Sequence, residues 1–288
     1  MAKAVKLSDI AERVGVSTVT VSKALSGQKG VSEEVREKIR SIAEELGYQQ
    51  PSAARKSQNQ KSYNIGILIS ERFLDKYESF YWQMYQSVAT RATAKECFTM
   101  LEVIGMAEEE NGRLPKLVQE RKVDGIIVIG KMMDAYLQHL NTEAGIPVIY
   151  LDYYNGREAS DSVISNSYYG TYELTYYLYR MGHRKIAYVG TLLATESITD
   201  RYFGYQKALL ELGLEQKKEW VLDDRHIETG EIDTVNMLQL PKDMPTAFVC
   251  NCDLTASFLI KKLKDNGYRV PEDISVVGFD NYLYPGLS

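Results

Sequence analysis

Five side chains near the N-terminus have the chemistry of a DNA-reading surface: Thr18, Val19, Thr20, Ser22 and Lys23. Hydroxyl groups and a lysine ammonium suit phosphate oxygens and base edges, and a valine methyl can contact the methyl group of thymine. A helix face that only meets solvent has a similar composition. Whether these residues form a DNA-reading surface or a solvent-exposed helix face therefore depends on the elements that position them.

Residues 8–25, SDIAERVGVSTVTVSKAL, predict two short helices joined by a tight turn. Gly15 stands where the turn needs a positive φ, which glycine adopts without a Cβ clash. Ser17 or Thr18 can cap the second helix with a side-chain oxygen. Apolar side chains face inward from both helices: Ile10, Ala11, Val14, Val21, Ala24 and Leu25. An ordinary corner between two core helices is the alternative, but this combination is typical of a DNA-binding helix-turn-helix.

A third helix is predicted after the loop at residues 26–30. Ser32 is its expected N-cap, and Glu33 and Glu34 in its first turn favour the helix dipole. Gly47 is expected to end it. Its apolar side chains recur at helical spacing: Val35, Ile39, Ile42, Ala43 and Leu46. The three helices enclose so small a core that we expect this unit to be marginally stable alone.

Charge is distributed unevenly along the 288 residues. Residues 1–61 carry eleven Lys and Arg against seven Asp and Glu, or +4, and the remainder carries −9. A basic head on an acidic body lets only the head meet a polyanion. With 44% hydrophobic residues, no membrane-length apolar run and no signal peptide, the sequence predicts a cytoplasmic globular protein. Three cysteines give neither a disulfide framework nor a zinc-binding spacing. The sequence also has no Gly-rich phosphate loop and no metal-ligand cluster, so neither metal nor cofactor is expected.

From Tyr63 onward, short apolar runs alternate with helical stretches. The runs are NIGILI, DGIIVIG, PVIYLD, KIAYVG, AFVCN and DISVVGF, and the helical stretches are residues 82–94, 114–121, 168–181, 201–213 and 254–267. Such Ile- and Val-rich runs predict parallel strands buried on both faces, and their alternation with helices predicts an α/β body. Two groups of three strands suggest two lobes that divide near residues 161–165. Ligands of such sheets bind beyond the carboxyl ends of the strands.

The motifs KLSDIAERVGVSTVTVSKALSG and VSEEVREKIRSIAEELGY, followed by Pro-Ser-Ala-Ala-Arg, resemble the head of the lactose/galactose repressor (LacI/GalR) family of bacterial transcription regulators. The resemblance covers nearly the whole chain and implies a body of the type I periplasmic-binding-protein kind, with a ligand cleft between two lobes. The residues implied to read bases in the major groove are Thr18, Val19 and Lys23, and those implied to hold phosphates are Ser17, Thr20 and Ser22.

The linker between head and body is polar and, taken alone, predicts a flexible tether. The resemblance implies instead a hinge helix that folds on the operator, with Ala53, Ala54 and Arg55 at the minor groove. Pro51 is displaced by one position from the family proline, and Ser57 replaces the leucine that wedges between base pairs. Because serine cannot fill an unstacked base step, we expect a smaller operator bend than with leucine-bearing relatives.

Five residues of the body match family positions that contact effectors: Phe80, Tyr81, Asp152, Arg201 and Asp280. Tyr153, next to Asp152, is a further aromatic candidate for a ligand contact. The resemblance implies that the acids bind hydroxyl groups, that Arg201 binds a sugar or a carboxylate, and that the aromatic rings stack on a sugar. The alternative is structural, because strand-end aspartates often cap helices and Arg201 could simply pair with Asp200. Polar family residues are replaced by Ser165, Cys252 and Asn281, so no particular sugar is implied.

Together these features predict a dimeric repressor that binds double-stranded operator DNA and responds to a small molecule, a sugar or sugar derivative, between its lobes. A solute-binding protein shares such a body but needs export and has no DNA-binding head. An enzyme is the third hypothesis, but no phosphate loop or nucleophile elbow supports it and no catalytic residue is predicted. The predicted domains are residues 1–48, 49–62, 63–163 and 164–288. The last is expected to be incomplete, because the family body continues beyond the strand that ends at Asp280.

Overall fold

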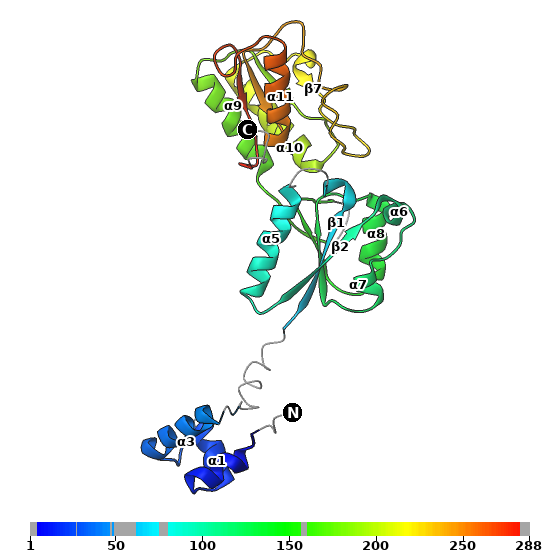
Figure 1. The fold of residues 1–288 in the computed structure, drawn as a ribbon. Coiled ribbons are helices and arrows are strands. Elements are labelled where there is room, and N and C mark those ends of the chain that lie inside the picture. Colours follow the sequence, from blue (N-terminus) through cyan, green and yellow to red (C-terminus); the bar gives the residue numbers. More distant parts are fainter. Residues whose placement is uncertain are drawn as a thin grey trace. The chain divides into compact units, whose positions relative to one another are not determined.

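The structure, a computed structural model, describes residues 5–26, 28–46, 48, 62–74, 80–156 and 160–282. The chain forms two compact units, residues 1–62 and 63–288 (Figure 1). The first unit contains three helices, α1 (Leu7–Val14), α2 (Thr18–Leu25) and α3 (Glu33–Glu45). Gly15 follows α1 with a φ of 79°, the left-handed conformation that was predicted for the turn.

Of the two expected helix caps in this unit, one makes a side-chain capping bond in the structure and the other does not. Ser17 caps α2, because its side-chain oxygen accepts a hydrogen bond from the backbone N–H of Thr20 at 3.1 Å. Ser32 occupies the N-cap position of α3 but makes no side-chain capping bond, so that part of the expectation was wrong. Gly47, the expected end of α3, lies outside the described residues.

The three helices share one apolar core. Its buried members are Ile10, Ala11, Val21, Ala24, Ile39 and Ala43, and side chains packed against it include Val14, Leu25, Val35, Ile42 and Leu46. These are the inward-facing residues that periodicity predicted. The core takes one face of α2 and leaves the opposite face of that helix to the surface.

Five parallel strands form the first sheet of the second unit, in the order β2-β1-β3-β4-β5. They are β1 (Asn64–Ser70), β2 (Phe98–Ile104), β3 (Gly125–Ile129), β4 (Val148–Leu151) and β5 (Asp161–Val163). Helix α5 (Phe80–Thr93) packs on one face, and α7 (Lys116–Gln119) and α8 (Asp134–Glu143) pack on the other (Figure 1). The short helix α6 (Met106–Glu110) follows β2. We call this sheet and its helices the first lobe.

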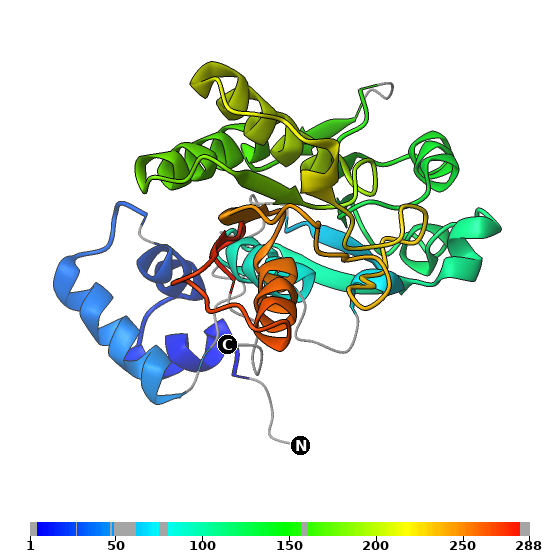
Figure 2. The ribbon, with the colours of Figure 1, turned by 90° about the horizontal axis from the view of Figure 1, so that it is seen from above.

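A second parallel sheet, in the order β7-β6-β8-β9, forms the second lobe with its own helices. Its strands are β6 (Ile186–Val189), β7 (Val221–Leu222), β8 (Ala247–Cys250) and β9 (Ser275–Val277). Helices α9 (Ser167–Arg180) and α10 (Glu196–Leu212) cover one face, and α11 (Asp253–Asp265) covers the other (Figure 2). Both lobes are therefore α/β layers of the predicted kind, with loops at the strand ends available for a site.

Several elements differ from those that the sequence predicted. Strands β2, β5 and β7 and helices α6 and α8 were missed. All three strands are sheet edges. Solvent exposure breaks the apolar run in β2, where Phe98 is 66% exposed, and in β5, whereas β7 has only the two residues Val221 and Leu222 and is too short to give a pattern. Helix α10 begins five residues before its expected start, because the Thr195 side chain caps it by accepting the N–H of Ile198 at 3.2 Å. The helix expected at residues 114–121 is reduced to the single turn α7.

Candidate functional site

The side chains predicted to read DNA lie together on the outer face of α2. Four of them are exposed: Thr18, Val19, Ser22 and Lys23. Val19 is 61% exposed, so this valine serves no packing role within the unit. The hydroxyl groups of Ser17 and Thr20 lie 2.9 Å apart at the start of the helix. This arrangement presents hydroxyls, one methyl-bearing side chain and one ammonium group on a single helix face.

The other predicted DNA contacts, Ala53, Ala54 and Arg55, lie outside the described residues, as does Ser57. Within the described ranges, no helix is long and apolar enough to cross a membrane. In the same ranges, no group of three or more His, Cys, Asp or Glu side chains is placed to hold a metal ion.

Arg36 has a role that the sequence pattern did not reveal. This α3 residue is only 8% exposed and lies against the C-terminal end of α2. Its Nη1 donates to the carbonyl oxygen of Ala24 at 2.8 Å, and its Nη2 donates to that of Gln28 at 2.9 Å. Carbonyl groups at a helix end have no partner within the helix, and a cation there also favours the helix dipole. Arg36 therefore fixes the end of the helix that carries the predicted DNA contacts.

Replacing Arg36 by methionine should destabilise the end of α2 by about 2 kcal/mol, because buried carbonyls lose their donors while the side-chain volume is nearly kept. Hydrogen exchange of the α2 amides in the full chain measures this effect as faster exchange. Arg40→Met, at an exposed position on the same helix, is the matched control. Equal exchange rates in the two variants would contradict the proposed support.

Four of the six predicted effector residues meet at the strand ends of the two lobes. The Tyr81 hydroxyl donates to Oδ2 of Asp152, which follows β4, at 3.3 Å. Arg201 Nη2 lies 3.1 Å from Oδ1 of Asp280, which follows β9. Both aspartates have positive φ values, 61° for Asp152 and 95° for Asp280. Such values are strained for residues other than glycine and persist only where the surroundings fix them.

Arg201 is held by the second lobe from several sides. It is 5% exposed, its Nε donates to Ser167 Oγ at 3.3 Å, and its Nη1 donates to the Asn251 carbonyl oxygen at 2.6 Å. Its guanidinium carbon lies 4.0 Å from the centre of the Phe279 ring. The arginine therefore has a structural role in addition to its predicted role, and only its remaining N–H groups are available to a ligand.

Burial controls the ionisation of this cluster. The pKa of Asp280 is raised to about 6, because burial and the nearby Asp152 and Asp253 charges raise it more than Arg201 and Arg225 lower it. Burial outweighs the ion pair here, because a nearly buried carboxylate loses its hydration. Burial likewise raises the pKa of Asp152, against the opposing effect of Arg201. It also raises the pKa of the Tyr81 hydroxyl, and both aspartates add to that shift.

The raised pKa of Asp280 predicts a pH dependence of stability. Between about pH 4 and pH 6 the folded chain binds a proton at Asp280 that the unfolded chain has released, so stability falls as the pH rises. Relative to Asp280→Asn, the free energy of unfolding of the wild type should fall by about 2–3 kcal/mol between pH 4 and pH 7. Urea unfolding at several pH values measures the difference, and parallel profiles for the two proteins would contradict it.

The two remaining predicted effector residues, Tyr153 and Phe80, lie outside the cluster of four. Tyr153 is 2% exposed and packs in the first-lobe core with its ring 5.2 Å from that of Tyr150, so the structure gives its ring a core position and its contact with a ligand stays a prediction. Its hydroxyl donates to Asp134 at 3.2 Å. Phe80 is half-buried, with its ring centre 6.1 Å from that of Tyr282. Phe80 thus lies beside the segment that carries Asp280, and its stacking on a ligand stays a prediction.

Two polar contacts join the lobes on helix α10. Lys131 follows β3, and its Nζ lies 3.1 Å from Glu196 Oε1. Tyr154 follows β4, and its hydroxyl donates to Asp200 Oδ1 at 3.0 Å. The alternative pairing of Asp200 with Arg201 is therefore not the one found. Both contacts end on the first two turns of α10, the helix that also carries Arg201.

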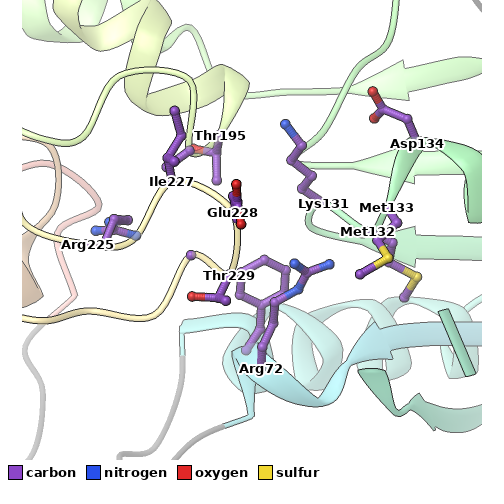
Figure 3. A pocket seen from close by; sticks show the side chains of 13 residues that line it. Arg72, Lys131, Met132, Met133, Asp134, Thr195, Arg225, Ile227, Glu228 and Thr229 are labelled. Carbon is purple, nitrogen blue, oxygen red and sulfur yellow. The ribbon is translucent and has the colours of Figure 1, made fainter. Parts of the chain in front are cut away.

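A cavity of about 290 Å³ lies between the lobes, beside the cluster that contains Tyr81 and Asp152 (Figure 3). Strand-end loops of both lobes line it: Arg72, Phe73, Lys131, Met132, Met133, Asp134, Ala194, Thr195, Arg225, Ile227, Glu228, Thr229 and Gly230. None of the six predicted effector residues is among these lining residues. The two regions adjoin at Phe73, because its ring centre is 4.7 Å from that of Tyr81.

Sequence patterns could have revealed part of this lining. Arg72 and Lys131 follow the predicted strands NIGILI and DGIIVIG within three residues, in loops where ligands were expected. Arg225 follows β7, which was not predicted, so no signal pointed to it. Arg225 donates two hydrogen bonds to Asp224, at 3.1 and 2.8 Å. The Arg225 guanidinium holds the pKa of Asp224 well below its usual range, against the opposing effect of burial.

Comparison with known proteins identifies both units. Residues 6–51 match the family described as bacterial regulatory proteins of the lacI family, and residues 175–288 match the periplasmic binding protein-like domain. The HTH-type transcriptional repressor PurR of Erwinia tasmaniensis is 30% identical over 293 residues, which cover 98% of this chain and 84% of the relative. The repressor of the same name from Aliivibrio salmonicida is 29% identical, with 98% and 85% covered.

Solved structures show the same fold. The lac repressor dimer bound to operator and the anti-inducer ONPF has a TM-score of 0.61 and 23% identity, covering 97% of this chain and 83% of that chain. The complex of the transcriptional regulator CelR with cellobiose has a TM-score of 0.59 and 23% identity, with 96% and 83% covered.

Proposed function

Because this chain belongs to the LacI family of bacterial regulatory proteins, and is a DNA-binding transcriptional regulator with an effector-binding body, we propose a division of labour among its residues. The outer face of α2 reads operator bases through Thr18, Val19 and Lys23, while Ser17, Thr20 and Ser22 hold phosphates. Ala53, Ala54 and Arg55 contact the minor groove. The observation that carries this proposal is the exposed, mixed polar face of α2, which the core leaves uncovered.

The chain acts as a homodimer on a near-palindromic operator, since two heads related by a two-fold axis match two half-sites. The lac repressor structure named above is a dimer bound to operator. We propose residues 1–48 as the head, 49–62 as the hinge, and 63–163 and 164–288 as the lobes. The protein works in the cytoplasm, and its role is regulatory rather than enzymatic.

The effector binds between the lobes, at the cavity and the adjoining cluster of Tyr81, Asp152, Arg201 and Asp280. The cavity together with the strained aspartates supports this proposal. A sugar or sugar derivative fits the carboxylates, which accept hydrogen bonds from hydroxyl groups, and the CelR relative is a cellobiose complex. The ligand alters DNA affinity only as far as it binds one lobe arrangement more tightly than the other.

Replacing Lys23 by alanine should weaken binding to a palindromic operator, selected from random-sequence DNA, by about 10- to 100-fold and relax its base preference. Gel-shift titration of selected and scrambled sites measures both effects. Lys38→Ala removes the same charge from an exposed position on α3 and is the matched control. If the two variants lose affinity equally on both sites, Lys23 contributes only its charge and the base-reading role is refuted.

A further inference from the structure

Three cationic side chains line the cavity from three different segments: Arg72, Lys131 and Arg225 (Figure 3). Each forms an ion pair with one carboxylate. The pairs are Arg72–Glu109 at 2.8 Å, Lys131–Glu196 at 3.1 Å and Arg225–Asp224 at 2.8 Å. The three carboxylates are not among the residues that line the cavity, and the side chains of Glu109 and Asp224 are fully buried. The ion pairs therefore point their positive ends toward the cavity.

The cations keep donors that form no hydrogen bond with any residue the structure describes. Nη1 of Arg72 and Nη1 of Arg225 have no hydrogen-bond partner among the described residues, and Lys131 Nζ makes one described bond of a possible three. The two arginine side chains are 13% and 12% exposed, so these donors are also poorly hydrated. Charge-assisted bonds from such fixed donors are the strong ones, and a guanidinium fork matches phosphate and carboxylate oxygens.

The carboxylates that do line the cavity oppose these cations only weakly. Asp134 accepts a hydrogen bond from the Tyr153 hydroxyl at 3.2 Å. Glu228 is exposed and forms no ion pair with any described residue. Because solvent screens an exposed carboxylate, Asp134 and Glu228 repel an anion only weakly. The charges of the three cations are largely balanced by their partner carboxylates, so an anion is favoured by the fixed N–H donors that the cations present at the cavity wall.

We propose that the cavity takes an effector with an anionic group, a phosphate or a carboxylate, bound by the free donors of Arg72, Lys131 and Arg225. This inference rests on the proposed effector function and specifies the chemistry of its ligand. The carboxylates behind the cations hold them in place before the ligand arrives, which reduces the entropy lost on binding. The apolar side chains Phe73 and Met132 provide a surface for the rest of the ligand.

Isothermal titration calorimetry of the full chain with inorganic phosphate, acetate, glucose 6-phosphate and glucose tests the proposal. Phosphate and glucose 6-phosphate should bind more tightly than glucose. Stronger binding of phosphate than of acetate assigns a phosphate group, and the reverse order assigns a carboxylate. Lys131→Met should weaken anion binding by about tenfold, the effect of losing one charge-assisted bond.

Glu228→Gln gives a test in the opposite direction, because it removes the exposed negative charge at the cavity and should tighten anion binding about two- to fivefold. Glu228 is exposed and forms no ion pair with any described residue, so we expect its replacement to leave the fold intact. Lys95→Met, at an exposed position remote from the cavity lining, should leave all affinities unchanged.

The proposal is overturned if the anions do not bind, or if Lys131→Met and Glu228→Gln leave their affinities unchanged. Operator binding by the same preparations separates this failure from that of the proposed function. Normal operator binding without anion binding refutes only the ligand class. Anion binding without operator binding refutes the DNA-binding roles instead.

Discussion

Replacing Arg201 by methionine should lower the free energy of unfolding of the body by about 3–5 kcal/mol, the usual cost of removing one partner from a buried ion pair. Asp280 would keep its burial but lose the guanidinium 3.1 Å away, and the Asn251 carbonyl oxygen would lose its donor at 2.6 Å. Denaturant unfolding followed by circular dichroism, at pH 7, measures this loss.

The double variant Arg201→Met/Asp280→Asn separates the ion pair from the packing of the arginine. It should recover part of the lost stability, because no buried carboxylate remains without a counter-charge. At pH 4 the single variant should also lose less stability than at pH 7, since Asp280 is then neutral in the folded state. A loss below about 1 kcal/mol at pH 7 is the range of an exposed ion pair and would refute the structural role of Arg201.

Replacing Gly204 by alanine should destabilise the second lobe by about 3 kcal/mol or more, at the upper end of the cost of overpacking a core. An added Cβ would lie 2.0 Å from the carbonyl oxygen of Tyr168 and 3.1 Å from the amide nitrogen of Tyr172, both on α9. These are backbone atoms of a neighbouring helix, so no side-chain rotation can relieve the contact.

Thermal unfolding of Gly204→Ala, compared with Gly125→Ala, provides the measurement. At Gly125 the nearest atom to an added Cβ is the Pro147 carbonyl oxygen at 3.5 Å, an ordinary contact, so that variant is the matched control. Because α10 carries Arg201 and is capped by Thr195, Gly204→Ala should also disturb the proposed effector site. Equal melting temperatures in the two variants would show that α9 and α10 can separate without cost.

The sequence predicted those parts of the fold whose local pattern matches their surroundings. The spacing of apolar residues around Gly15 was sufficient for the helix-turn-helix, because each of its short helices buries one face. Strands β1 and β8 were predicted because helices cover both of their faces and their central residues are apolar. Edge strand β2 was missed because exposure introduces Thr99 and Glu102 into its run.

The sequence predicted a site residue only where its position depends on residues next to it in the chain. The strand-end position of Asp280 indicated a place in a loop at the sheet edge, and the structure pairs this residue with Arg201. Tyr153 lies in the core, which no neighbouring residue indicates. The burial of Arg36 depends on carbonyl groups twelve and eight residues away. Such partners become visible only when the tertiary structure brings the segments together.

The two contacts that reach α10 from the first lobe set the manner in which the lobes can separate. Glu196 and Asp200 are one helical turn apart, so a rigid α10 cannot release Lys131 and retain Tyr154 in place. We expect opening to break both contacts together. A first lobe tied to one rigid helix at two points then favours two lobe arrangements over a series of intermediate ones, and a ligand that prefers one arrangement can bias them.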